Sequence, residues 1–469
     1  MQQEFAREVL GRLPLAEAVL TLWRWVGDPL FLLALFARHR GAGYERVLSF
    51  ATLVELMADA LLEHRGSGRK SFARAREQGQ LEASVQAVYQ KLGRVRLGLS
   101  EAWLAESTAR VQPVYPVAAR TSLPPSVQEF AVMVVDGKAI KKVAKRLKPL
   151  RGRKGGVLGG KALVALELAS GLAVAMATDP DGETNDARLV PALLPQVRGR
   201  IAGPRLWVAD RQFCDLRQTA AFATAQDHFV VRYHPKVHFH PDPTRPARQG
   251  QDAQGRAWVE DWGELGQERA TQRRFVRRLT LYRPGEETII LITDLLAAEQ
   301  YPANDLLGLY LARWGIERVF QQITEVFHLQ ALIGTTPQGT IFQLAFCLLL
   351  YNLLQVVRAY VATAQARPAE TISTELLFDD VQRQLVALTE LVPPPVIAPL
   401  FEPLPSPDRV GQHLARLLAA VWTPRWLKAP AKKPKPPTAR TAIKGNQTSA
   451  YRLLTAYRQQ QQTVTSPPQ

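Results

Sequence analysis

The chain has 469 residues, enough for about two to four domains, and 46% of them are apolar, so it can build hydrophobic cores and a disordered chain is excluded. Lysine and arginine number 59 against 42 aspartates and glutamates, which gives a formal net charge of +17. This charge favours a polyanionic partner, with nucleic acid as the first expectation and an anionic membrane surface as the second.

Residues 1–125 are predicted to form a helical region that contacts nucleic acid. Apolar residues recur at helical spacing in FATLVELMADALLEH, and basic segments such as RGSGRKSFARARE are expected to connect the helices. The first twenty residues carry acidic side chains where a signal peptide is basic, so we do not expect secretion. VQPVYP and TSLPPS then break helicity near residues 111–126.

Residues 126–358 are predicted to form an α/β domain. Three runs of strand type, FAVMVVDG, ALVALELAS and LAVAMATDP, precede a helical stretch, DARLVPALLPQV, and a further strand, RLWVADRQF. This order predicts a mixed sheet flanked by helices. Further strand-like segments from about 226 to 295 predict a β-rich insertion.

The rest of the chain is predicted to be mostly helical. The apolar window at 341–358 carries Gln343, Asn352 and Gln355 and is slightly short for a membrane span, so we expect a buried helix and no membrane segment. Residues 359–427 are predicted to form a helical region. Residues 428–469 are basic and Pro-rich, which predicts a flexible tail that either adds phosphate affinity or only improves solubility.

A helix predicted over Tyr310–Val326 has two distinct sides. At about 100° per residue, Tyr310, Arg313 and Glu317 fall in one sector. The adjacent sector is apolar and holds Leu309, Ile316, Val319, Phe320, Ile323 and Phe327. An ordinary amphipathic helix with a solvated polar stripe would show the same pattern. Whether this helix carries functional residues therefore depends on acids elsewhere in the chain.

Two aspartates supply that evidence. Asp136 follows VMVV and Asp210 follows LWVA, so both are expected at strand ends, facing a cleft. A turn aspartate is the simpler explanation of each one alone. A carboxylate beside an apolar core costs free energy unless it is paired or binds metal, and three acids including Glu317 can hold two Mg²⁺ or Mn²⁺ ions for phosphodiester chemistry.

Three segments carry a resemblance to a known family. VVDGK around Asp136, VADRQF around Asp210 and YLARWGIERVF around Glu317 resemble the acidic motifs of DDE transposases of the insertion-sequence-four family. The last segment is similar to that family's tyrosine, arginine and glutamate signature, with Thr324 where the signature has lysine. The similarity covers roughly residues 130–358.

The resemblance implies an RNase H-like catalytic core and a DNA transposase of an insertion sequence. Such a protein binds double-stranded DNA at the element's ends, cleaves it and joins the 3′-OH to target DNA, usually as a homodimer. The expected location is the bacterial cytosol, at the nucleoid. Asp136, Asp210 and Glu317 would be the catalytic residues and would hold two Mg²⁺ ions, for which Mn²⁺ is a substitute.

The same resemblance implies that Tyr310 and Arg313 contact phosphate near the cleaved end. Trp314 lies at the edge of the same helix side, where a core or stabilising role is expected and base stacking is the alternative. The basic run from Gly137 to Gly156 either is a solvated surface or tracks the DNA backbone. Further candidates for DNA contacts are Lys138, Lys141, Lys142 and Arg211.

Two other functions stay open. A transposase-derived DNA-binding protein with impaired catalysis would keep the fold and the charge, and Thr324 favours it. An RNase H-like metal nuclease that cuts without joining would share all three acids.

Three patterns are read as structural. GGVLGGK, from Gly155, matches G-x-x-x-x-G-K, but Ala162 replaces the required Ser or Thr and a strand follows, so no P-loop is expected. Four histidines within HFVVRYHPKVHFH, at positions 228, 234, 238 and 240, fit a strand face better than a zinc site. Cys214 and Cys347 have no metal-ligand spacing, so we expect inert core thiols in a reducing compartment.

Overall fold

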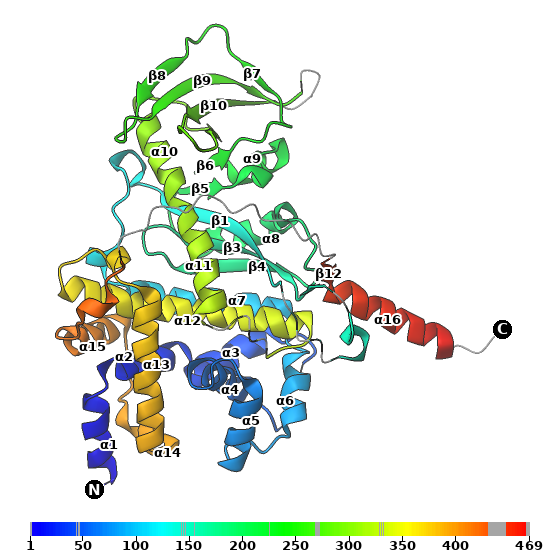
Figure 1. Cartoon of the computed structure of the whole chain (residues 1–469), viewed down its shortest axis with the longest axis vertical. Helices are drawn as coiled ribbons and strands as arrows, with labels where there is room; N and C mark the ends of the chain where they lie inside the picture. The colour runs from blue at the N-terminus through cyan, green and yellow to red at the C-terminus, as the bar shows by residue number, and fades with distance from the viewer. Residues whose placement is uncertain are drawn as a thin grey trace.

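A large mixed sheet lies in the upper part of the molecule and a layer of helices lies below it (Figure 1). The computed structural model describes residues 2–429 and 447–465, apart from residues 44, 46, 142, 144, 146, 154, 225, 268–272, 328, 330 and 332. The predicted α/β class, with a mixed sheet and helices packed against it, is confirmed.

Ten strands of the described residues form this sheet, in the order β4-β3-β1-β5-β6-β11-β10-β9-β7, with β8 also paired to β9. Strands β1, β5 and β6 are parallel to one another, and the other neighbours are antiparallel. The strands are β1 (Ala131–Ala139), β3 (Lys161–Glu167), β4 (Ala173–Asp179), β5 (Arg205–Ala209), β6 (Asp227–Arg232), β7 (Phe239–Pro241), β8 (Arg248–Gln251), β9 (Ala257–Leu265), β10 (Arg274–Leu281) and β11 (Ile289–Thr293).

The central strands are apolar because both of their faces are covered. All of β5 and residues 132–135 of β1 are buried, as expected for parallel strands with packing on both sides. Helix α8 (Val190–Arg198) connects β4 to β5 and packs on β3 and β4, while α9 (Leu216–Phe222) connects β5 to β6.

The β-rich stretch at 226–295 is not a separate body. Strand β6 pairs with β5 and belongs to the central sheet, and β11 pairs with β6, so that β7–β10 continue the same sheet. The strands β7–β10 lie at the top of Figure 1, and helix α10 (Ala303–Ala312) descends from them toward α11 (Trp314–Glu325).

Several of the helices outside the sheet, including α2, α7, α13 and α15, pack on α12. The remaining helices are α1 (Gln2–Gly11), α2 (Pro14–Val26), α3 (Pro29–His39), α4 (Phe50–Leu62), α5 (Gly68–Glu77), α6 (Val85–Leu92), α7 (Leu97–Val111), α12 (Pro337–Ala364), α13 (Thr374–Leu391), α14 (Pro394–Ile397), α15 (Pro407–Leu418) and α16 (Ala450–Thr465). Helix α2 packs on α7, α12, α13 and α15. The regions predicted at 1–125 and 359–427 therefore share one helical layer. The segment RGSGRKSFARARE, which was predicted to connect helices, instead contains helix α5.

Helix α12 is buried, as predicted. Its Asn352 side chain accepts a hydrogen bond from Ala173 N (2.9 Å) and donates to Ala173 O (2.9 Å) and to Thr108 Oγ1 (2.8 Å). Among the described residues, α12 alone is by itself long and apolar enough to cross a membrane, and its most apolar window is entirely buried; α2 and α3 pass the same test only as a pair bent by 44°.

The C-terminal prediction is wrong for residues 447–465. Strand β12 (Thr448–Ser449) pairs in parallel with β2 (Val157–Leu158), and α16 follows and projects away from the body (Figure 1). Arg452 pairs with Asp181 (2.7 Å) and with Glu183 (2.6 Å). The Pro- and Lys-rich composition of the preceding residues obscured the apolar and aromatic spacing of AYRLLTAY.

Candidate active site

Parallel strands bring Asp136 and Asp210 to the same part of the sheet. Val135 of β1 lies opposite Ala209 of β5, so the residues that follow them emerge side by side. Asp210 comes directly after β5, as predicted. Asp136 is not at a strand end, because β1 continues to Ala139 in its pairing with β3. The side of β1 that faces β5 is free at Asp136, since β5 has already ended.

Helices α10 and α11 bring the third acid to the two aspartates. Arg313 Nη2 donates to Glu317 Oε1 at 2.9 Å, and Arg313 Nη1 lies 3.7 Å from Asp136 Oδ2. The Tyr310 hydroxyl donates to Asp210 Oδ1 at 3.4 Å. Arg313 and Tyr310 therefore connect all three carboxylates.

The single helix predicted over Tyr310–Val326 is interrupted at Arg313. The backbone bonds around it join residues three apart: Arg313 N to Tyr310 O and Ile316 N to Arg313 O, each 3.0 Å. The apolar side of α11 is buried as predicted. The two charged residues of the other side differ in exposure: Arg313 is 3% exposed, whereas the Glu317 side chain is 54% exposed.

Asp136 is a mostly buried carboxylate, and the effect of burial on its pKa outweighs that of the nearby Arg313. Burial raises the pKa of Asp136 to about 6, helped by Glu317 and Asp186 and opposed by Arg313 and by the Gly137 N–H. A carboxylate with a raised pKa gains free energy when a cation binds. Three carboxylates are hard oxygen donors of the kind that Mg²⁺ and Mn²⁺ prefer, so this donor set fits divalent ions.

The three carboxylates are spread out. Among the described residues, three metal-ligand atoms lie within 4.8 Å of one another only in Asp59, Glu63 and His64. Asp136, Asp210 and Glu317 do not form such a compact group in this structure.

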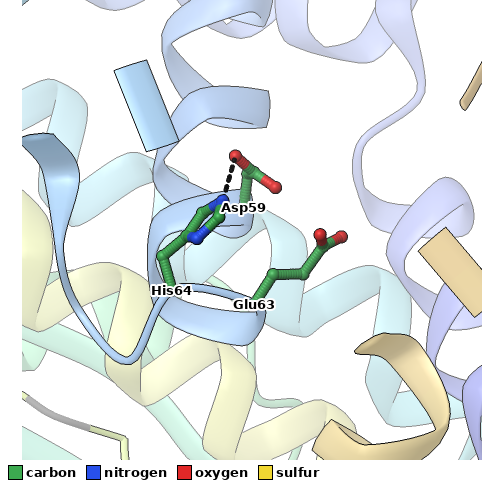
Figure 2. Close-up of side chains that lie close together, drawn as sticks. All are labelled: Asp59, Glu63 and His64. Carbon is green, nitrogen blue, oxygen red and sulfur yellow. Dashed lines mark ion pairs between the residues drawn. The ribbon is translucent and has the colours of Figure 1, made fainter. Parts of the chain in front are cut away.

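The Asp59, Glu63 and His64 group lies in the helical layer, at the end of α4 (Figure 2). His64 Nε2 is 3.6 Å from Asp59 Oδ2, and a Glu63 carboxylate oxygen lies within 4.8 Å of a ligand atom of each of these two residues (Figure 2). Burial and the neighbouring Asp59 raise the pKa of Glu63 to about 7. Glu63 thus binds a proton more tightly in the folded protein than in the unfolded chain.

Glu63→Gln should stabilise the protein at alkaline pH. Ionisation of Glu63 lowers the free energy of unfolding of the wild type progressively as pH rises from 4.5 through about 7. At pH 8 the variant should have a free energy of unfolding higher by about 1–3 kcal/mol, and at pH 4 it should equal the wild type. Urea unfolding at both pH values measures this. The exposed Glu82→Gln serves as the control, and an equal gain at both pH values would contradict the explanation.

The predicted DNA-binding residues lie in different surroundings. Lys138 Nζ donates to Thr324 Oγ1 at 3.0 Å and to Phe320 O at 3.3 Å. Burial and the nearby Lys141 lower the pKa of Lys138. Lys141 is exposed, and Lys142 lies outside the described residues.

Arg211 and Trp314 both lie at the surface near the acids. Arg211 Nη1 is 3.5 Å from Glu287 Oε1. Trp314 is 38% exposed, and the guanidinium carbon of Arg283 lies 5.7 Å from its ring centre. Trp314 is therefore not a core residue.

The patterns set aside in the sequence have structural explanations. Strand β2 lies within the glycine-rich segment, and β3 begins at its last residue, Lys161, which pairs with Asp186. His228 is 3.2 Å from Asp294, and His240 bonds to Gly266 O at 3.0 Å.

Both cysteines are buried in the core, as predicted. Burial raises the pKa of Cys214 to about 11 and that of Cys347 still further. Neither thiol is expected to ionise at neutral pH.

One buried acid beside the site was missed. Asp186 is 6% exposed and follows β4, in a segment that the sequence predicted as plain helix. The available signal was the Asn185–Asp186 pair, since Asn and Asp before an apolar helical run are typical of a helix start.

Comparisons with known proteins bear on this geometry. Residues 128–353 match the family model described as a transposase DDE domain. Among solved structures, the chain is similar to a piggyBac transposase, described as a cryo-EM structure of a synaptic complex with hairpin DNA. The identity is 8% and the TM-score 0.36, over 89% of this chain and 85% of that chain, so the similarity is remote. No curated protein matches the chain. The family match, which spans both aspartates and Glu317, supports a DDE transposase.

Proposed function

We propose that the protein is the DNA transposase of an insertion sequence of the insertion-sequence-four family. It would bind the element's ends, cleave them with Mg²⁺ and transfer the 3′-OH to target DNA. The observation that carries this proposal is the joining of Asp136, Asp210 and Glu317 around Arg313 and Tyr310. The net charge of +17 suits a double-stranded DNA partner.

The proposed core is RNase H-like. In support, three antiparallel neighbours, β4, β3 and β1, are followed in the sheet by β5 and β6, which run parallel to β1. This order places Asp136 of β1 next to the end of β5, and ligands of open α/β sheets usually bind at such strand ends.

Asp136, Asp210 and Glu317 would hold two Mg²⁺ ions, with Mn²⁺ as a substitute. Bound ions of this kind activate the attacking oxygen and stabilise the leaving one. Burial raises the pKa of Tyr310 to about 12, so its hydroxyl stays a hydrogen-bond donor. Arg313 Nε has no hydrogen-bond partner among the described residues, so the guanidinium keeps one unused donor beside the acids.

Lys138 favours an active enzyme over an inactive descendant. Thr324 lacks the positive charge of the signature lysine, but the Lys138 ammonium hydrogen-bonds to the Thr324 hydroxyl. Strand β1 thus supplies a cation at the position where the signature lysine is expected. We propose that Lys138, exposed Lys141 and Arg211 contact the DNA backbone, together with Lys142, and that Trp314 offers a stacking surface.

Glu317→Gln should bind the element's end DNA like the wild type but lose cleavage. Labelled end DNA is incubated with protein and either Mg²⁺ or EDTA, and nicked, excised and joined strands are resolved on a denaturing gel. The exposed Glu390→Gln on α13 is the control. Cleavage by Glu317→Gln at the wild-type rate would overturn the assignment.

The same gel separates the two other functions. Metal-dependent cutting without joining, also with pre-cut 3′-OH ends, would identify a nuclease. Tight binding without cutting under either condition would identify an inactive DNA-binding descendant. We further propose that the protein acts as a homodimer on two DNA ends, in the bacterial cytosol at the nucleoid.

A further inference from the structure

Asp186 is a buried acid for which the proposed reaction has so far no use. It begins the short 3-10 helix η5 (Asp186–Leu189), and the Asn185 side chain fixes that turn by accepting from Ala187 N at 2.9 Å. The two oxygens of the Asp186 carboxylate differ: Oδ1 is ion-paired but has no hydrogen bond among the described residues, and Oδ2 accepts a hydrogen bond. Oδ1 lies 2.6 Å from Lys161 Nζ, and Oδ2 accepts from Gln212 Nε2 at 2.8 Å.

The Asp186 carboxyl also packs directly on the backbone of Gly137. A Cβ atom added at Gly137 would lie 2.1 Å from Asp186 Cγ and 2.2 and 2.3 Å from the two oxygens. No side chain fits there unless the carboxylate moves. Glycine at 137 is therefore required for the close approach of the acid to β1.

These contacts reach the segments that follow Asp136 and Asp210 in the chain. Gly137 directly follows Asp136. Gln212 lies two residues after Asp210, in the 3-10 turn η6 (Arg211–Phe213) that continues from β5. Lys161 begins β3, where it pairs with Ala139 of β1. One carboxylate thus links the segment after Asp136, the segment after Asp210 and the start of the strand beside them.

We infer that Asp186 is a positioning residue that holds Asp136 and Asp210 in register for binding divalent cations. This inference rests on the proposed function. Asp186 itself is not expected to bind metal, because the Lys161 ammonium already neutralises its charge in an ion pair at Oδ1 and Gln212 donates to Oδ2. Partners that orient metal ligands typically change metal affinity by about 10–100-fold when they are removed.

A purely structural ion pair would look similar, so the test needs a matched control. Asp227 supplies it: it is fully buried, it pairs with Arg198 (2.7 Å) and Arg205 (2.8 Å), and it lies at the opposite end of the parallel strands, next to the start of β5. Asp186→Asn and Asp227→Asn each remove the charge from a buried pair on the same sheet. Both should lower thermal stability.

The experiment titrates the full-length, DNA-free protein with Mn²⁺ and follows free Mn²⁺ by electron paramagnetic resonance. Asp186→Asn should weaken Mn²⁺ binding by about tenfold or more, while Asp227→Asn should bind Mn²⁺ like the wild type. Gln212→Leu removes a single hydrogen bond from an exposed residue, so it should weaken Mn²⁺ binding with little change in thermal stability. This variant keeps the test valid if Asp186→Asn does not fold.

Three results would overturn the inference. Wild-type Mn²⁺ affinity in both Asp186→Asn and Gln212→Leu would make Asp186 merely structural. Loss of as many bound ions in Asp186→Asn as in Asp136→Asn would make Asp186 a direct ligand. Mn²⁺ binding by the wild type that survives Asp136→Asn would instead refute the proposed metal site, and the inference with it.

Discussion

Asp136→Asn should abolish DNA cleavage and at the same time stabilise the protein. Loss of a proposed metal ligand should remove several kcal/mol of transition-state stabilisation, so cleavage should fall by at least about 10³-fold. Burial raises the pKa of Asp136 to about 6, so its ionisation destabilises the folded state increasingly as pH rises from 3.8 to about 6. At pH 8 the variant should gain about 1–3 kcal/mol in free energy of unfolding.

Urea unfolding in EDTA at pH 4 and pH 8, beside the gel assay, measures both effects. The gain in stability should vanish at pH 4, where Asp136 is protonated in the wild type. A variant that is less stable than the wild type at pH 8 would show that the Asp136 carboxylate serves mainly as the ion-pair partner of Arg313.

Arg277→Met should destabilise the protein by about 3–5 kcal/mol, because it leaves Glu260 buried without its main partner. Arg277 is fully buried, and its Nε donates to Glu260 Oε2 at 2.7 Å. Its Nη1 donates to Tyr301 O at 2.6 Å, just before α10. The pair therefore joins β9 and β10 to the helices that carry Tyr310 and Glu317.

The adjacent Arg278 provides the control. Its side chain is 26% exposed and pairs with Asp261, so Arg278→Met should cost only about 1 kcal/mol. Urea unfolding of both variants gives the comparison. Equal losses would mean that Arg248, whose Nε is 3.2 Å from Glu260 Oε1, already compensates the buried carboxylate.

The strands whose apolar runs are visible in the local sequence could be predicted from the sequence alone. The apolar runs of β1, β3, β4 and β5 are continuous because these strands are buried, and a run of that kind is visible in one sequence. The parallel pairing of β1 with β5, which places Asp136 beside Asp210, is a long-range choice with no local signal. The sequence therefore indicated both aspartates without showing how they meet.

The site was partly predictable for a related reason. Arg313 and Glu317 are four residues apart, so helical periodicity alone places them together. Lys138 reaches Thr324 and Gln212 reaches Asp186 across different elements. Such contacts depend on the tertiary fold, which is why Thr324 appeared to lack a cation and Asp186 escaped notice.

Because β12 pairs with β2, this two-stranded sheet cannot fold when β2 is synthesised and must form only after β12 has been translated. Val157 and Leu158 leave the ribosome long before their pairing partners Thr448 and Ser449. Glu183, which accepts a hydrogen bond from Ser449 N, is likewise synthesised long before its partner. Closing so long a stretch of chain is entropically costly and slow. We therefore expect that, in a nascent chain, β2 stays unpaired and the loop before Asp186 lacks its hydrogen bond to residue 449 until that residue has emerged.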